Sequence, residues 1–194
     1  MIPKFILPAL LAVTVGCTTV RETQTERTAT EQLMLSHAVM AAAKAIEAEP
    51  LRGKKVFLET GFVKSVDQEF VIGELRARML QIGADLVQDA NASEVVVEAR
   101  SAGLGIDEAT SNLGIPAVPI PVPMVGTFQT PEVSFFKAQQ RTGISGLSLT
   151  AYEQATGKHL FSVGPVIGST HRNDWSIIGI RIYRNRNNLP PEVK

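Results

Sequence analysis

The sequence predicts an α+β fold, in which a mixed, largely antiparallel sheet carries two main helices packed on one face. Two stretches with apolar residues at helical spacing lie in the first half of the chain, and alternating, strand-like segments fill the last third. Hydrophobic residues make up 44% of the 194 residues and charged residues 20%, which is ordinary for a globular protein. These observations predict one compact domain over residues 28–194.

Both helices have recognisable ends. Thr28 and Glu31 form a capping-box pattern, and Pro50 follows the end of the first helix. Ser65 and Gln68 suggest a second capping box, and Gly83 is a typical C-terminal residue. The apolar positions of the two helices are Leu35, Val39, Ala42 and Ile46, then Val71, Leu75, Met79 and Ile82. Gly73 inside the second helix predicts close packing against a strand.

Strands are expected over residues 55–63 and 94–99, with an interruption at Gly103-Leu104-Gly105. Residues 133–141 and 144–153 are predicted to form a hairpin around Thr142-Gly143, and residues 159–163 form a strand that ends at Gly164-Pro165. Residues 175–183 are expected to form a short helix or an edge strand.

Residues 112–131 form an apolar, proline-rich segment, which we interpret as an extended loop with polyproline II character. An exposed apolar patch usually marks a protein or membrane contact, so this loop is a candidate contact surface. The alternative is that it lies over a sheet face and completes the core. The candidate contact residues are Ile115, Val118, Ile120, Val122 and Met124.

The N-terminus has the layout of a secretory signal peptide over residues 1–16: Lys4, an apolar run over residues 5–15, and the small Gly16 before Cys17. The run is too short for a membrane-spanning helix. There are two alternatives. The apolar run could be a membrane anchor, or the protein could be secreted and its cysteine incidental.

With the only cysteine of the chain directly after Gly16, this segment resembles the lipobox of bacterial lipoproteins, although Thr14 stands where that family prefers Leu. The resemblance implies cleavage before Cys17, lipidation of its thiol, and a membrane anchor. It also implies a lipid-anchored polar tether over residues 17–27, and Thr18, in place of Asp, favours the outer membrane, facing the periplasm.

Signatures of catalysis are nearly absent: we find no P-loop, no G-x-S-x-G and no H-E-x-x-H. Ser169, His171 and Asp174 have the residue types of a hydrolase triad but crowd into six residues, so a polar turn is preferred. The loop with Asp107, Glu108 and Asn112 matches no EF-hand spacing, and we interpret it as solvated. No cofactor, metal or catalytic residue is therefore predicted.

Charge argues against nucleic acid as a partner, because the formal net charge is zero. The C-terminal region is locally basic, and we interpret it as a charged strand edge rather than as a lipid headgroup site. Its arginines are Arg172, Arg181, Arg184 and Arg186.

Short motifs along the mature chain resemble an uncharacterised family of bacterial lipoproteins, a domain of unknown function. They are Arg27-Thr28-Ala29-Thr30-Glu31-Gln32-Leu33, Gly114-Ile115-Pro116, Thr156-Gly157 and Gly164-Pro165. The order helix, strand, helix, strand, followed by a strand before Ala155-Thr156-Gly157-Lys158, is more distantly similar to the periplasmic domain of curli-secretion-type lipoproteins. These resemblances imply assembly and scaffolding.

The sequence therefore predicts a non-enzymatic lipoprotein of the cell envelope, which binds or scaffolds another envelope protein on the periplasmic face of the outer membrane. One alternative is a subunit of a curli-like secretion or appendage-assembly complex, which predicts a homo-oligomer. A periplasmic hydrolase that uses the region of Ser169, His171 and Asp174 is the second alternative.

Overall fold

A computed structural model describes residues 27–65, 67–123, 126–178, 180–182 and 188–189. The predicted signal peptide and nearly all of the predicted tether lie outside these residues. The helices are α1 (Ala29–Lys44) and α2 (Gln68–Ile82), with 3-10 turns η1 (Glu49–Leu51) and η2 (Ala90–Ala92). The strands are β1 (Lys55–Phe62), β2 (Asp85–Val87), β3 (Val95–Ile115), β4 (Pro119–Val122), β5 (Gly126–Gln129), β6 (Val133–Glu153), β7 (His159–Ile177) and β8 (Ile180–Ile182).

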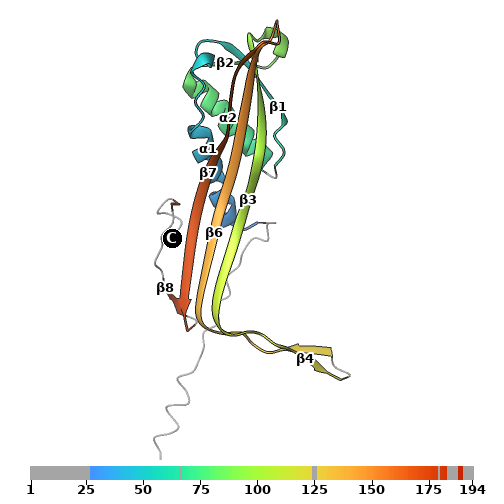
Figure 1. The fold of residues 1–194 in the computed structure, drawn as a ribbon, viewed down its shortest axis with the longest axis vertical. Helices are drawn as coiled ribbons and strands as arrows, with labels where there is room; N and C mark the ends of the chain where they lie inside the picture. Colours follow the sequence, from blue (N-terminus) through green and yellow to red (C-terminus); the bar gives the residue numbers. More distant parts are fainter. Residues whose placement is uncertain (1–26, 66, 124–125, 179, 183–187, 190–194) are drawn as a thin grey trace, which may run out of the picture.

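The architecture is the predicted α+β fold. Six strands form one sheet in the order β2-β1-β3-β6-β7-β8, and β4 and β5 form a separate hairpin. β1 is parallel to β2 and β3, whereas the remaining neighbours in the large sheet are antiparallel. Figure 1 shows both helices beside one end of the sheet, with β3, β6 and β7 continuing well beyond them.

The core lies between the two helices and the near half of the sheet. Val56 of β1 and Val97 of β3 face Leu75 and Met79 of α2, and all four side chains are buried. Every apolar position predicted for the two helices is buried as well, namely Leu35, Val39, Ala42, Ile46, Val71, Leu75, Met79 and Ile82. The capping box of Thr28 and Glu31 is present, and Gly83 is left-handed (φ 95°).

α1 lies directly against the sheet because two glycines leave room for its backbone. A Cβ at Gly168 of β7 would lie 1.9 Å from the carbonyl oxygen of Ala38 and 2.5 Å from the nitrogen of Ala42. A Cβ at Gly143 of β6 would lie 3.2 Å from the oxygen of Met34. The buried hydroxyl of Thr170 donates a hydrogen bond to that same Met34 oxygen, at 2.8 Å.

The strands run further than predicted. Gly103 and Gly105 do not interrupt β3, and Thr142-Gly143 is not a turn but the middle of the continuous strand β6. Gly164-Pro165 does not end β7, because both residues lie opposite Ser148 in a bulge between two regular stretches of pairing. The predicted hairpin is therefore wrong, since glycine here serves helix packing and bulges rather than turns.

Two helix details also differ from prediction. α2 begins after Asp67, and Ser65 makes no capping bond; its buried hydroxyl has no hydrogen-bond partner within the described part of the chain. Gly73 packs against nothing, since a Cβ there would meet no atom within 4 Å.

The environments of Gly168 and Gly73 predict opposite effects of replacing each glycine by alanine. Gly168→Ala forces a methyl group into the backbone of α1, and we expect it to lower the free energy of unfolding by about 3 kcal/mol. Gly73→Ala is the matched control, and it should raise that free energy by roughly 0.5–1 kcal/mol, because alanine favours helix. Urea unfolding of the two purified variants tests both, and an unchanged midpoint for Gly168→Ala would contradict the packing.

Candidate functional site

The part of the fold that the helices leave uncovered is the candidate site. We call residues 102–115 of β3, 133–146 of β6 and 166–177 of β7 the distal sheet, and residues 116–131 the arm. In Figure 1 the arm leaves the end of the sheet and turns away from its long axis. Its base is closed by two hydrogen bonds, from Val118 N to the Thr130 hydroxyl (2.8 Å) and from Thr130 N to Val118 O (3.1 Å).

The arm is a β-hairpin rather than the predicted loop. Pro119 and Pro121 alternate along β4, so both residues that lack an N–H occupy equivalent positions of a two-stranded ribbon. Ile120 lies opposite Phe128 of β5. Proline was expected to exclude a central strand, and β4 is instead a strand of a two-stranded hairpin, which tolerates it.

Three of the five predicted contact residues are exposed at the sheet end and along the arm. Ile115, Val118 and Ile120 are 56%, 49% and 45% exposed, and Phe128, which the sequence analysis missed, is 60% exposed. They do not complete the core. Val122 pairs through its backbone with Gly126, and Met124 lies outside the described residues.

One face of the distal sheet ends in an apolar cluster. Directly opposite residues share a face, so the pairing gives a row of Leu113, Phe136 and Ile177. Trp175 lies one pair further along this face, and its ring meets that of Phe136 edge-on with centroids 5.8 Å apart. Leu113, Trp175 and Ile177 are 69%, 45% and 44% exposed. Phe136 and Ala138 stand two residues apart, as do Trp175 and Ile177, and this strand-like spacing is the sequence signal that could have identified the cluster.

The opposite face, on the side of α1, is polar. Glu108, Arg141 and Arg172 form one row across β3, β6 and β7. Glu108 accepts hydrogen bonds from the Gln139 amide and from Arg141 Nε (3.1 Å). Arg172 bonds to Asp174 at 3.1 Å and to the hydroxyl of Thr30, just inside α1, at 3.4 Å.

Further along the same face, the carboxylate of Glu132 is contacted by three side chains. Asn112 Nδ2 (2.8 Å) and the Ser134 hydroxyl (2.9 Å) donate to its carboxylate, and Lys137 Nζ lies 3.5 Å away. The Ser134 hydrogen bond, followed by the charge of Lys137, lowers the pKa of Glu132. The pKa of Glu108 is also lowered, mainly by the Gln139 hydrogen bond and next by the charge of Arg141.

The residues considered for catalysis do not form a triad. Ser169 and His171 share one face of β7, whereas Asp174 points to the other face, where it binds Arg172. Asp107 and Glu108 likewise lie on opposite faces of β3, and Asn112 is bonded to Glu132. Across the described ranges, no group of three acidic, histidine or cysteine side chains could hold a metal ion.

Arg184 and Arg186 lie outside these ranges, so the predicted basic edge is described only at Arg172 and in the backbone of Arg181.

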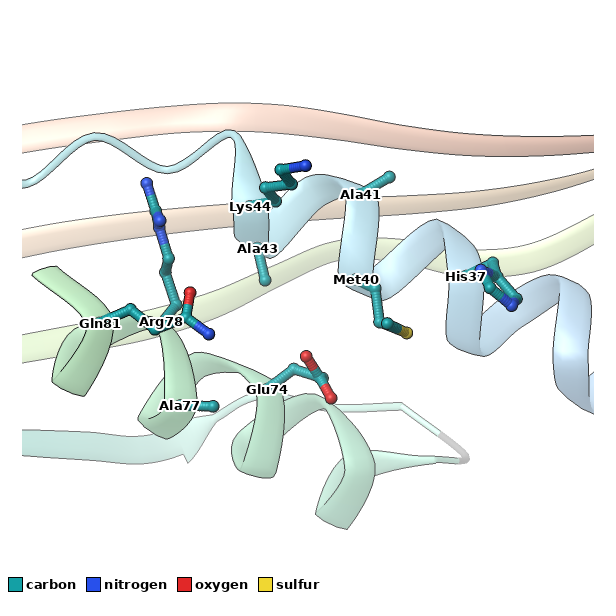
Figure 2. Close-up of a pocket in the computed structure, with 9 residues that line it drawn as sticks. All are labelled: His37, Met40, Ala41, Ala43, Lys44, Glu74, Ala77, Arg78 and Gln81. Atoms are coloured by element: carbon teal, nitrogen blue, oxygen red, sulfur yellow. The ribbon is translucent and has the colours of Figure 1, made fainter. Parts of the chain in front are cut away.

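A groove of about 460 Å³ lies between the two helices. Figure 2 shows Met40 and Ala43 of α1 on one side and Glu74 and Ala77 of α2 on the other. Arg78 donates two hydrogen bonds, of 2.7 and 3.0 Å, to the carbonyl oxygen of Ile46. The groove is therefore a seam between packed helices, and Arg78 joins α2 to the chain just after the end of α1.

A comparison with protein families matches a family model to residues 12–188. The chain belongs to this family of unknown function, DUF6655. The predicted membership in a domain of unknown function is thus confirmed, while similarity to lipoproteins and to curli-secretion proteins stays a prediction. A comparison with curated proteins gives no match. Among the described residues, no helix is long and apolar enough to cross a membrane.

The polar face predicts the titration of two carboxyl groups. Glu108 and Glu132 should titrate at midpoints below the ordinary value of 4.5, because hydrogen bonds and nearby cations favour their charged forms. Their contribution to stability is present above that value and is lost as the pH falls through the lowered pKa. Carboxyl-carbon NMR titration measures both midpoints. Gln139→Ala should raise the midpoint of Glu108 and leave that of Glu132 unchanged; a shift in neither would refute the assigned cause.

Proposed function

We propose that this protein is a non-enzymatic, lipid-anchored component of the cell envelope that binds another envelope protein through its arm. The observation that carries the proposal is the arm itself, which holds Val118, Ile120 and Phe128 exposed at the far end of a long sheet. Exposed apolar surface of this kind usually marks a contact site. Cys17 and the segment before it support a lipid anchor, and Thr18 supports the periplasmic face of the outer membrane.

The geometry is suited to presenting a contact surface at a distance. The packed helices form a stable body, and the arm connects the ends of β3 and β6, the continuous strands that also cross that body. A tether over residues 17–27 would let the body stand off from the membrane that holds the lipid.

A second candidate function is a subunit of a secretion or appendage-assembly complex of the curli type. The distal sheet favours it, because this sheet is long, ends in an apolar cluster on one face, and leaves one edge of β3 beyond Ser101 unpaired within the described residues. Such sheets are suited to association with further strands.

The lipid anchor is tested at Cys17. In cells grown with labelled palmitate, the wild-type chain should carry the label and sediment with membranes, because several acyl chains together give durable anchoring. Cys17→Ser should carry no label and move to the soluble fraction. Thr18→Ser is the matched control, and label on Cys17→Ser would refute lipidation at this residue.

The arm is tested by photo-crosslinking in cells. A photoreactive amino acid at Ile120 should give one defined protein adduct, because Ile120 is exposed in the proposed contact surface. The same amino acid at Leu80 of α2, which is apolar and 57% exposed, is the control and should give none. Ile120→Asp, with the photoreactive residue moved to Phe128, should abolish the adduct without changing the unfolding midpoint. Equal adducts from Leu80 and Ile120, or none from Ile120, would contradict the proposal.

A further inference from the structure

We propose that the end of the distal sheet rests on the lipid leaflet that holds Cys17, with its apolar cluster in the boundary between headgroups and acyl chains. This inference rests on the proposed lipid anchor and deepens it, because it adds a second contact between the protein and the membrane. The arm starts at this end of the sheet, so it would meet its protein partner at the membrane surface.

The first observation is that the apolar cluster belongs to an uncharged end of the sheet. On the face opposite α1, the last three rows are Ala109-Gln140-Asn173, Ser111-Ala138-Trp175 and Leu113-Phe136-Ile177. None of these residues is charged, and Ile180 of β8, which pairs with Ile177, is 71% exposed. Charge returns in the next row, at Asp107. Apolar side chains bordered by uncharged polar groups suit a surface that enters the headgroup boundary.

The second observation is the turn after β7, which exposes an isoleucine in a strained backbone conformation. Ile178 has a φ of 48°, in the left-handed region, and its side chain is 72% exposed. A β-branched residue in this region is an outlier, and such strain is found mainly at functional sites. Trp175, three residues earlier, is also exposed. Tryptophan is enriched where a membrane meets water, so both residues favour a lipid surface as the occupant.

The third observation is where the predicted tether joins the fold. Thr30, near the start of α1, contacts Arg172, whereas Ala42 near its end lies against Gly168. α1 therefore starts beside the distal sheet and runs away from it, toward the helical body (Figure 1). The tether thus joins the protein on the side of the apolar cluster.

The length of the tether decides which end of the sheet the lipid can reach. Residues 17–26 precede Arg27 and span at most about 36 Å when fully extended. Along β3, Glu108 of the Arg172 row is five residues from Leu113, about 17 Å, but thirteen residues from Val95, about 43 Å. A lipid on Cys17 can therefore reach the level of the apolar cluster but not the opposite end of β3. Held so near, even a small contact has a high effective concentration of lipid.

The test uses Trp175, which is the only tryptophan of the chain and lies inside the proposed contact. The full-length lipidated protein is reconstituted in phosphatidylcholine vesicles with or without bromine on the acyl chains, which quenches nearby tryptophan. The fluorescence of Trp175 should fall by about half in the brominated vesicles, because its ring lies at the membrane interface. Flotation of the vesicles and the mass of the N-terminal peptide show separately whether the chain carries its lipid.

These readouts separate the membrane contact from the anchor. Protein that carries the lipid and floats, but shows no quenching, overturns the membrane contact and leaves the anchor intact. If Cys17 carries no lipid, the anchor fails and the proposed contact fails with it, because no tether then holds the sheet at the leaflet.

Aspartate variants locate the contact. Leu113→Asp and Ile180→Asp each place a charge at an exposed position of the cluster, and each should lower the quenching at least about twofold, because charge is excluded from the apolar boundary. Leu80→Asp on α2 is the matched control and should leave the quenching unchanged. All three variants should keep the wild-type unfolding midpoint. Equal quenching in the three would overturn the assignment to this cluster.

The rival occupant of the cluster is a second copy of the chain. In buffer without vesicles, Cys17→Ser should be monomeric by light scattering, and acrylamide should quench Trp175, because the ring is exposed. With brominated vesicles this variant should show little quenching, since it lacks the effective concentration that the anchor supplies. A dimer in which Trp175 is shielded from acrylamide would overturn the membrane contact and assign the cluster to association between copies.

Discussion

The close approach of α1 to the sheet is the constraint on which the rest of the structure depends. Gly168 and Gly143 let a helix backbone touch β7 and β6 directly, and Thr170 fixes it with a hydrogen bond to Met34. This contact buries one face of the sheet near the helices. The distal sheet, which extends past the start of α1 at Thr30, has no helix over it. Past that point, polar networks line the side of α1 while an apolar cluster ends the other side.

The two faces of the distal sheet differ in polarity. On the side of α1, charged and amide groups satisfy one another, as with Glu108 and Gln139, so this face suits water. On the other side the aromatic pair of Phe136 and Trp175 supports an exposed apolar row. A sheet built this way is stable enough to fold but retains surface and edges for partners, which links the packing of α1 to the proposed contacts.

Much of the fold was predictable because the signals that define a helix lie within a few residues of one another in the sequence. The capping box at Thr28 and the apolar positions of α1 and α2 need only neighbours in sequence, and all were confirmed. The long strands were missed because Gly143 and Gly164-Pro165 have the local appearance of turns. Their actual roles, helix contact and a bulge, depend on chain segments far away. The arm residues were identified by composition, whereas the apolar row on the distal sheet required the register of three strands.

The continuity of β3, β6 and β7 has a mechanical consequence. β3 and β6, of 21 residues each, span about 70 Å at 3.3 Å per residue, and both pass without a turn from the helical body to the end of the sheet where the arm begins. Since neighbouring strands are hydrogen-bonded along their length, the far end of the distal sheet cannot swing independently of the body. The large sheet therefore behaves as a stiff spacer, and strand length sets the distance between the helical body and the base of the arm.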